Sequence, residues 1–149
     1  MGKNLKDMQN YANAIYQNAM VGVQSVRDIE DKVENENLKK EILCEAEKFN
    51  EIADKVKIFV EKKGFEVKEN NFFEKSRLWA TINMSTMFDN STRHIAEMML
   101  LGTVMGLVTC YKDKYDHKNV SEDLDKILLE LEETEDENYL RLKKFLKSL

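Results

Sequence analysis

The chain has 149 residues, of which 42% are hydrophobic and 34% are charged. This length suits one domain with one core, residues 1–149, and the composition argues against intrinsic disorder. The net charge of −5 comes from 23 basic and 28 acidic residues, with no Lys/Arg cluster long enough to form a positive stripe. We therefore expect neither nucleic acid nor an anionic membrane as a partner.

From the lack of an export signal and the wide spacing of the two cysteines, we expect a cytoplasmic protein. The N-terminal segment MGKNLKDMQN is polar and lacks the apolar core of an export signal. The longest uncharged apolar run, from Met98 to Tyr111, has about 14 residues against the ~20 of a bilayer span, so no transmembrane helix is expected. Cys44 and Cys110 lie far apart without a CxxC motif, and we expect both to be buried, reduced thiols.

The first predicted helix follows from the near absence of helix breakers. The sequence has no proline and only five glycines, which favours an all-helical fold. Asn4 is expected to cap this helix together with Asp7, and its apolar residues recur at steps of three and four. The expected buried stripe is Leu5, Met8, Ala12, Ile15, Ala19, Gly22, Val26 and Ile29.

A second helix is predicted to follow the charged stretch DIEDKVENEN. Asn35 or Asn37 can cap it, and Lys62, Lys63 and Gly64 suit its end, because cations favour the negative end of the helix dipole and glycine adopts the left-handed cap. Its expected buried residues are Leu38, Ile42, Phe49, Ile52, Val56 and Phe59.

The third predicted segment is unusually long. A capping box at Asn71 and Glu74 opens a helical pattern that continues to about Tyr115, over 60 Å at 1.5 Å per residue. We therefore expect a long or kinked third helix, with a kink or break near Asp89-Asn90-Ser91-Thr92, where four side chains compete for backbone hydrogen bonds.

The last helix is predicted to begin at Ser121, after the loop KDKYDHKN, in which His117 is expected to be solvated. Its expected buried residues are Leu124, Leu128, Leu131, Leu142, Phe145 and Leu149. Four helices with short connections favour antiparallel neighbours, so the predicted fold is an all-α, antiparallel four-helix bundle.

Polar residues interrupt these apolar stripes. Glu45 falls between Ile42 and Phe49 on the second helix, and Glu135 and Asn138 fall on the stripe of the last helix. A buried carboxylate without a partner costs several kcal/mol, so each inward Glu needs a metal, a base, a hydrogen-bond donor or a shifted pKa. We expect these groups to meet at mid-height in the bundle.

The third segment adds His94 to this layer. One register of its apolar pattern, 87-90-94-97-101, places Asn90, His94 and Glu97 inside, and another, 87-91-94-98-101, keeps only His94 inside. His94 is inward under both, whereas Glu97 depends on the register.

This constellation resembles the ferritin-like superfamily, in which a four-helix bundle holds two iron or manganese ions. The family pattern takes one Glu from each of two helices and a Glu-x-x-His from each of the other two. Glu45 matches a single-Glu position, Glu135-x-x-Asn138 resembles Glu-x-x-His with Asn in place of His, and His94-x-x-Glu97 has the right residues in reverse order. The resemblance implies metal ligation by Glu45, His94, Glu97, Glu135 and Asn138.

Two functions remain open. The first is a ferritin-like metalloprotein that binds iron or manganese at this layer and handles iron or oxygen. The second is a non-catalytic ferritin-like bundle that has lost a complete di-metal site and acts as an oligomeric structural or interaction module. The first helix has no Asp or Glu between Asp7 and Asp28, so only Gln17 or Gln24 remains as a weak substitute, which favours the second function.

The run from Met98 to Tyr111 predicts close packing and assembly. Gly102 and Gly106 form a GxxxG pattern, for which we expect a close helix crossing with the small face Ala12, Ala19 and Gly22. An apolar surface around most of the helix must be covered on all sides. A central helix enclosed within one chain would satisfy this requirement, but we expect a homodimer with this segment at or beneath the contact.

Overall fold

A computed structural model describes residues 4–69 and 89–149. Its elements are α1 (Leu5–Ile29), a 3₁₀ turn η1 (Glu30–Lys32), α2 (Glu36–Lys62), α4 (Thr92–Asp116) and α5 (Glu122–Ser148). Every regular element in the described ranges is helical, so the all-α prediction is confirmed there.

The helix ends follow the capping residues in the sequence. The side chain of Asn4 accepts a hydrogen bond from the backbone N–H of Asp7 at 2.9 Å, and Asn35 accepts one from Leu38 N–H at 2.9 Å. Gly64 follows α2 with φ +82°, a left-handed conformation that favours glycine. The predicted starts of α1 and α2 and the predicted end of α2 are therefore confirmed.

The third predicted segment is interrupted where its polar side chains cluster. Residues 89–91 are not helical, and Ser91 caps α4 by accepting a hydrogen bond from the backbone N–H of His94 at 3.3 Å. This is the break expected near Asp89–Thr92. The part of the predicted helix between residues 71 and 88 lies outside the described residues.

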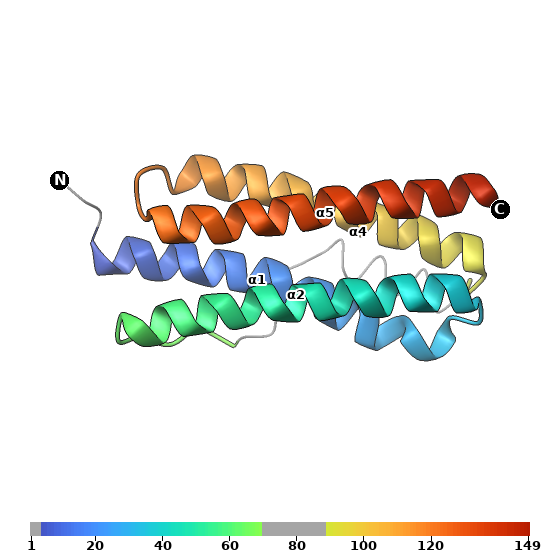
Figure 1. The fold of residues 1–149 in the computed structure, drawn as a ribbon, viewed down its shortest axis with the longest axis horizontal. Helices are drawn as coiled ribbons and strands as arrows, with labels where there is room; N and C mark the ends of the chain where they lie inside the picture. Colours follow the sequence, from blue (N-terminus) through green and yellow to red (C-terminus); the bar gives the residue numbers. More distant parts are fainter. Residues whose placement is uncertain (1–3, 70–88) are drawn as a thin grey trace.

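Two antiparallel hairpins build the bundle, α1 with α2 and α4 with α5 (Figure 1). The Tyr11 hydroxyl, near the start of α1, donates a hydrogen bond to Asp125 at the start of α5, so α1 and α5 run in the same direction. Val26, near the end of α1, shares a buried cluster with Ile95 at the start of α4, so these two helices are antiparallel.

Chain neighbours are therefore not all antiparallel. Because α2 and α4 both oppose α1, they run in the same direction, and the end of α2 and the start of α4 lie at opposite ends of the bundle (Figure 1). The helix order is up, down, down, up, with one connection that crosses the length of the bundle. The two helices are separated by 29 residues, 63–91, of which residues 70–88 lie outside the described part of the chain.

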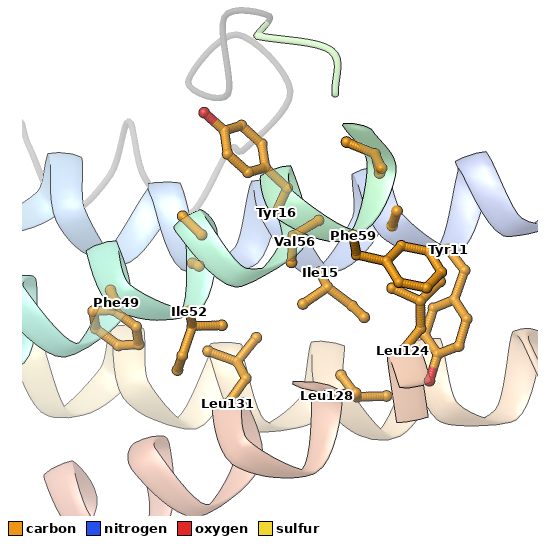
Figure 2. Close-up of a cluster of buried hydrophobic side chains, with 14 of the residues drawn as sticks. Tyr11, Ile15, Tyr16, Phe49, Ile52, Val56, Phe59, Leu124, Leu128 and Leu131 are labelled. Atoms are coloured by element: carbon orange, nitrogen blue, oxygen red, sulfur yellow. The ribbon is translucent and has the colours of Figure 1, made fainter. Parts of the chain in front are cut away.

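The buried side chains form two hydrophobic clusters, one toward each end of the bundle. Figure 2 shows the first, where Tyr11 and Phe59 pack near Leu124. The second is built from Val26, Ile29, Val33, Leu38, Ile42, Ile95, Ala96, Met99 and Leu142. Most expected core positions are confirmed, but Leu5 and Leu149, at the ends of the bundle, are exposed.

The buried face of α4 differs from the prediction. Its buried residues are Ile95, Ala96, Met99, Thr103, Cys110 and Asp113. Leu101, which both predicted registers placed inside, is half exposed, so both registers are wrong. The physical reason is that α4 carries apolar side chains all round between Met98 and Tyr111, and a pattern without a polar face does not identify the buried face.

Candidate functional site

A polar layer separates the two hydrophobic clusters. Glu45 of α2 is 1% exposed, and Glu135 and Asn138 of α5 are 4% and 0% exposed. Each belongs to an amphipathic helix whose neighbouring positions on the same face are apolar, which explains its inward direction. The prediction that these three side chains point into the bundle is confirmed.

Glu45 is held in its neutral form by its surroundings. Burial, then a hydrogen bond with Glu41 and the negative charge of Glu41, raise the pKa of Glu45 to about 10, against the opposing effect of Arg141. Arg141 itself donates hydrogen bonds to Glu41 at 3.1 Å and to the Asn138 side-chain oxygen at 2.6 Å. The Arg141 charge is thus balanced by Glu41, and Glu45 remains a protonated carboxyl group at neutral pH.

Glu135 occupies a space that a glycine leaves open. A Cβ atom added at Gly106 would overlap the Glu135 carboxyl group. The thiol of Cys110 lies 4.0 Å from the same carboxyl group, and Asn18 of α1 donates a hydrogen bond to the Gly106 carbonyl oxygen at 3.2 Å. Burial, and to a lesser extent the negative charge of Asp136, raises the pKa of Glu135 well above its ordinary value, which favours the neutral form of this carboxyl group.

The two glycines of the predicted crossing, Gly106 and Gly22, each lie against a large side chain, although Asn18, next to Ala19 on α1, does reach the Gly106 carbonyl oxygen. Gly106 approaches Glu135 of α5, and Gly22 approaches the ring of Phe49 on α2. Both glycines do make room for a neighbouring helix, but the neighbour supplies a large side chain rather than a small one.

His94 and Glu97 lie away from the polar layer. Because α4 begins at Thr92, His94 is in its first turn, about 18 Å along the helix from Gly106 at 1.5 Å per residue. His94 Nδ1 is 3.9 Å from an Asp89 carboxylate oxygen, and Glu97 forms an ion pair with Arg93 at the surface. The predicted convergence of His94 with Glu45 and Glu135 is therefore wrong.

The five predicted metal ligands are not assembled into one group. Within residues 4–69 and 89–149, no set of three His, Cys, Asp or Glu side chains is placed to hold a metal ion. On α1, the weak substitute Gln24 donates its amide N–H to Asp28 at 2.9 Å. Glu45, Glu135 and Asn138 together form a buried layer of two carboxyl groups and an amide, in which Glu45 Oε2 and Asn138 Nδ2 have no hydrogen-bond partner among the described residues. Metal binding by these residues stays a prediction.

The two thiols have different surroundings. Cys110 is buried, as expected, and burial raises the pKa of its thiol, which keeps it unreactive. Cys44 is exposed, so the expectation of a second buried thiol is wrong. Cys44 directly precedes Glu45 on α2, so its side chain points away from the buried apolar face that carries Glu45.

A second polar group lies where α4 meets the start of α1. The ring of His117 stacks on Tyr11, with centroids 4.7 Å apart and planes 8° apart, and burial lowers the pKa of His117. Asp113 is buried, no partner for its Oδ2 atom is found in the described part of the chain, and burial raises its pKa to about 6. The expectation of a solvated His117 is wrong, because α4 continues to Asp116 and directs the ring onto α1.

The opposite side of α4 carries an apolar surface, which we call the α4 outer face. It comprises Leu101, Val104, Met105, Val108 and Tyr111, which are 50%, 38%, 45%, 52% and 52% exposed. No charged residue occurs between Glu97 and Lys112. This face belongs to the segment from which the sequence predicted assembly, and the structure now defines which side of the helix is free.

By length and composition alone, α4 is the one described helix that meets the criterion for crossing a membrane. In its most apolar 18-residue window, 28% of the residues are buried in the bundle. Core helices of soluble bundles meet the same criterion, so this finding does not by itself place α4 in a bilayer.

Comparisons with protein-family models, curated proteins and solved structures gave no significant match to this chain. Its function is therefore argued from the polar layer and the α4 outer face.

Proposed function

We propose that this chain is a non-catalytic, ferritin-like bundle that acts as an interaction module by binding a second copy of itself through the α4 outer face. The observation that carries the proposal is the exposure of five apolar residues on a helix without a charge from Met98 to Tyr111. Single exposed apolar residues are common, whereas a continuous apolar stripe usually marks an interface.

A second copy is the simplest occupant, because a two-fold axis lets the same face cover itself. The surface between α2 and α5, by comparison, carries exposed ion pairs. There, Lys48 pairs with Glu137 at 3.5 Å and Lys55 pairs with Glu130 at 2.7 Å. The α4 outer face has no such charges, and a homodimer removes it from water.

The closed polar layer supports the non-catalytic part of the proposal. Glu45 and Glu135 are 1% and 4% exposed, so in this structure they do not contact a dissolved substrate. The single long crossover in the helix order is the order of ferritin-like bundles, which supports the ferritin-like assignment. A bundle of this kind without an assembled ligand set is suited to a structural role.

A matched pair of variants tests the self-association. Val108→Glu places a charge on the α4 outer face, and Ile58→Glu places the same charge on α2 at a position with 53% exposure, close to the 52% of Val108. By light scattering, the wild-type chain and Ile58→Glu are expected to have a mass of about 35 kDa, twice the 17.5 kDa of one chain, and Val108→Glu to be monomeric.

Two results would overturn the proposal. One is an equal mass for Val108→Glu and Ile58→Glu, which would locate any contact elsewhere. The other is a monomeric wild-type chain that binds phosphatidylcholine vesicles through α4, which would assign this face to a lipid surface.

Metal analysis tests the metalloprotein hypothesis. Protein expressed in iron-supplemented medium is analysed for iron and manganese, with Glu45→Gln and Glu135→Gln as controls. A stoichiometric metal that both substitutions remove would restore this hypothesis, and a metal-free protein would support the structural role.

A further inference from the structure

We propose that the two copies meet with their α4 helices antiparallel, across a two-fold axis between Val104 and Met105, so that the acidic half of one α5 faces the basic half of the other. This inference rests on the proposed function, which it extends from the existence of a dimer to its orientation and register. Three features of the described residues carry it: the spacing of the exposed apolar residues, the charges that bound them and the charge distribution along α5.

The spacing of the α4 outer face is that of a helix–helix seam. Leu101, Val104, Val108 and Tyr111 follow one another at steps of three, four and three residues. Alternating steps of three and four are those of coiled-coil a and d positions. A narrow seam of this kind fits a second helix, whereas a lipid surface requires no such register.

The residues that bound the seam are related by the proposed axis. An antiparallel pair centred between Val104 and Met105 places Leu101 of one copy opposite Val108 of the other. The same symmetry places Glu97 opposite Lys112, the two charged residues that end the uncharged run, although each also has an ion pair within its own chain, Glu97 with Arg93 and Lys112 with Asp116. One axis position therefore pairs apolar with apolar residues and the acidic end of the seam with its basic end.

The charge along α5 changes sign part-way through the helix. Residues 122–137 contain nine acidic residues and one lysine, and residues 138–148 contain four basic residues and no acidic ones. The acidic residues are Glu122, Asp123, Asp125, Glu130, Glu132, Glu133, Glu135, Asp136 and Glu137, and the basic ones are Arg141, Lys143, Lys144 and Lys147.

The acidic half of α5 borders the seam. Glu135 packs on Gly106 and lies 4.0 Å from the Cys110 thiol of α4, and Glu132 and Asp136 flank Glu135 on α5. In agreement with this placement, partial desolvation and the negative charges of Asp136 and Glu132 raise the pKa of Tyr111. On the same face of α5, the helical period continues from Asp136 to Lys143 and Lys147.

The level at which the charge of α5 changes sign agrees with the level of the proposed axis on α4. Glu135 packs on Gly106 of α4, so the change of charge in α5, a few residues further along, lies close to the level of Val104. Because α5 runs opposite to α4, Asp136 lies on one side of this level and Lys143 on the other. An antiparallel dimer brings unlike halves of α5 together, whereas a parallel dimer brings acidic to acidic and basic to basic.

Single cysteines on the seam distinguish the two orientations. In a Cys44→Ser background, Val104→Cys is expected to form a disulfide-linked dimer under mild oxidation, because the axis passes beside this residue. Val108→Cys alone is expected not to cross-link, because the two copies of residue 108 are offset by about 10 Å along the helices, beyond the ~7 Å Cα separation that a disulfide spans. A mixture of Leu101→Cys and Val108→Cys is expected to cross-link.

Each outcome has a defined meaning. Cross-linking of Val108→Cys with itself, at a rate similar to Val104→Cys, would show a parallel dimer and overturn the inference while leaving the proposed function intact. Before oxidation, light scattering of the Cys44→Ser parent establishes whether a dimer exists, and a monomer there would overturn both. Circular dichroism checks that each cysteine variant is folded.

Salt dependence gives a second test that needs no substitution. Raising NaCl from 0.05 M to 0.3 M is expected to weaken an antiparallel dimer by about two- to tenfold in Kd, because it screens attraction between unlike halves of α5. A dimer whose Kd decreases with salt would have like charges facing each other, which would contradict the antiparallel orientation.

Discussion

The polar layer places polar side chains in the interior and the α4 outer face places apolar side chains on the surface, so both depart from the usual distribution of residues in a soluble bundle. The layer places the carboxyl groups of Glu45 and Glu135 inside the bundle, and the outer face places Leu101, Val104 and Val108 in water. In the layer, burial favours the neutral form of both carboxyl groups and Arg141 donates a hydrogen bond to the Asn138 side-chain oxygen, but Glu45 Oε2 and Asn138 Nδ2 have no hydrogen-bond partner among the described residues. The outer face is exposed in the described chain, and we propose that a second copy covers it.

The comparison teaches that a residue in an unusual environment does not by itself mark a functional site. A buried carboxyl group suggested a metal site, but the bundle accommodates it as a neutral group. An apolar helix suggested a core, but one of its faces is free. The following substitutions test the two regions in order of decreasing expected effect.

The largest effect is expected from Gly106→Leu, which fills the space that the Glu135 carboxyl group occupies. Overpacking of this kind is expected to lower the free energy of unfolding by about 3 kcal/mol. Urea denaturation at a fixed protein concentration measures this change. Gly64→Leu is not a suitable control, because Gly64 has a positive φ that leucine rarely adopts. Thr109→Leu is the control, because Thr109 lies on the same helix as Gly106 and its hydroxyl donates a hydrogen bond to the Met105 carbonyl oxygen. An unchanged stability in Gly106→Leu would show that Glu135 does not pack on this glycine.

Glu45→Gln is expected to stabilise the protein more as the pH rises. The folded state raises the pKa of Glu45 to about 10 from an ordinary value of 4.5, so the wild-type protein loses stability as the pH rises between these values. At pH 8 the neutral amide is expected to raise the free energy of unfolding by about 2 kcal/mol, with almost no gain at pH 4. Urea denaturation at both pH values measures the difference. A destabilised variant at pH 8 would show that Glu45 is charged and paired in the fold.

Asp113→Asn is also expected to raise the free energy of unfolding, with the gain developing over a narrower pH range than for Glu45→Gln. Burial raises the pKa of Asp113 from 3.8 to about 6, so wild-type stability falls as the pH rises from about 4 to 6 and is level above that. Above pH 6 the amide is expected to add about 1–2 kcal/mol to the free energy of unfolding. Thermal unfolding at pH 4 and pH 7 measures this gain. A gain of equal size at both pH values would contradict the account.

The smallest effect is expected from Lys55→Ala, which removes an ion pair with Glu130 on the wet surface between α2 and α5. Both side chains are substantially exposed, so the loss is expected to be about 0.5 kcal/mol or less. Thermal unfolding measures it, and a loss as large as that of Gly106→Leu would show that surface charges, rather than the close packing at Glu135, hold the hairpins together.

The sequence predicted the elements with a clear polar face and failed on the element without one. In α2 and α5, apolar residues at steps of three and four identified Glu45, Glu135 and Asn138 as inward. In α4, apolar residues surround the helix between Met98 and Tyr111, so periodicity selected a face that is in fact free.

Two further errors came from element boundaries. His94 was expected at mid-height because the third segment was read as one long helix, whereas α4 begins two residues before it. The buried Asp113 and the half-buried His117 were missed as neighbours of Tyr11 because KDKYDHKN has the composition of an exposed loop. The step of three and four residues through Gly106, Cys110 and Asp113 was the signal that could have found the buried aspartate.

The central claim is that the α4 outer face is covered by a second copy of the chain. Sedimentation equilibrium of the wild-type protein across the micromolar range tests it most directly. The account predicts a mass of about 35 kDa, twice that of one chain, that declines toward the mass of one chain only on dilution. A constant mass of 17.5 kDa across the whole range would contradict it.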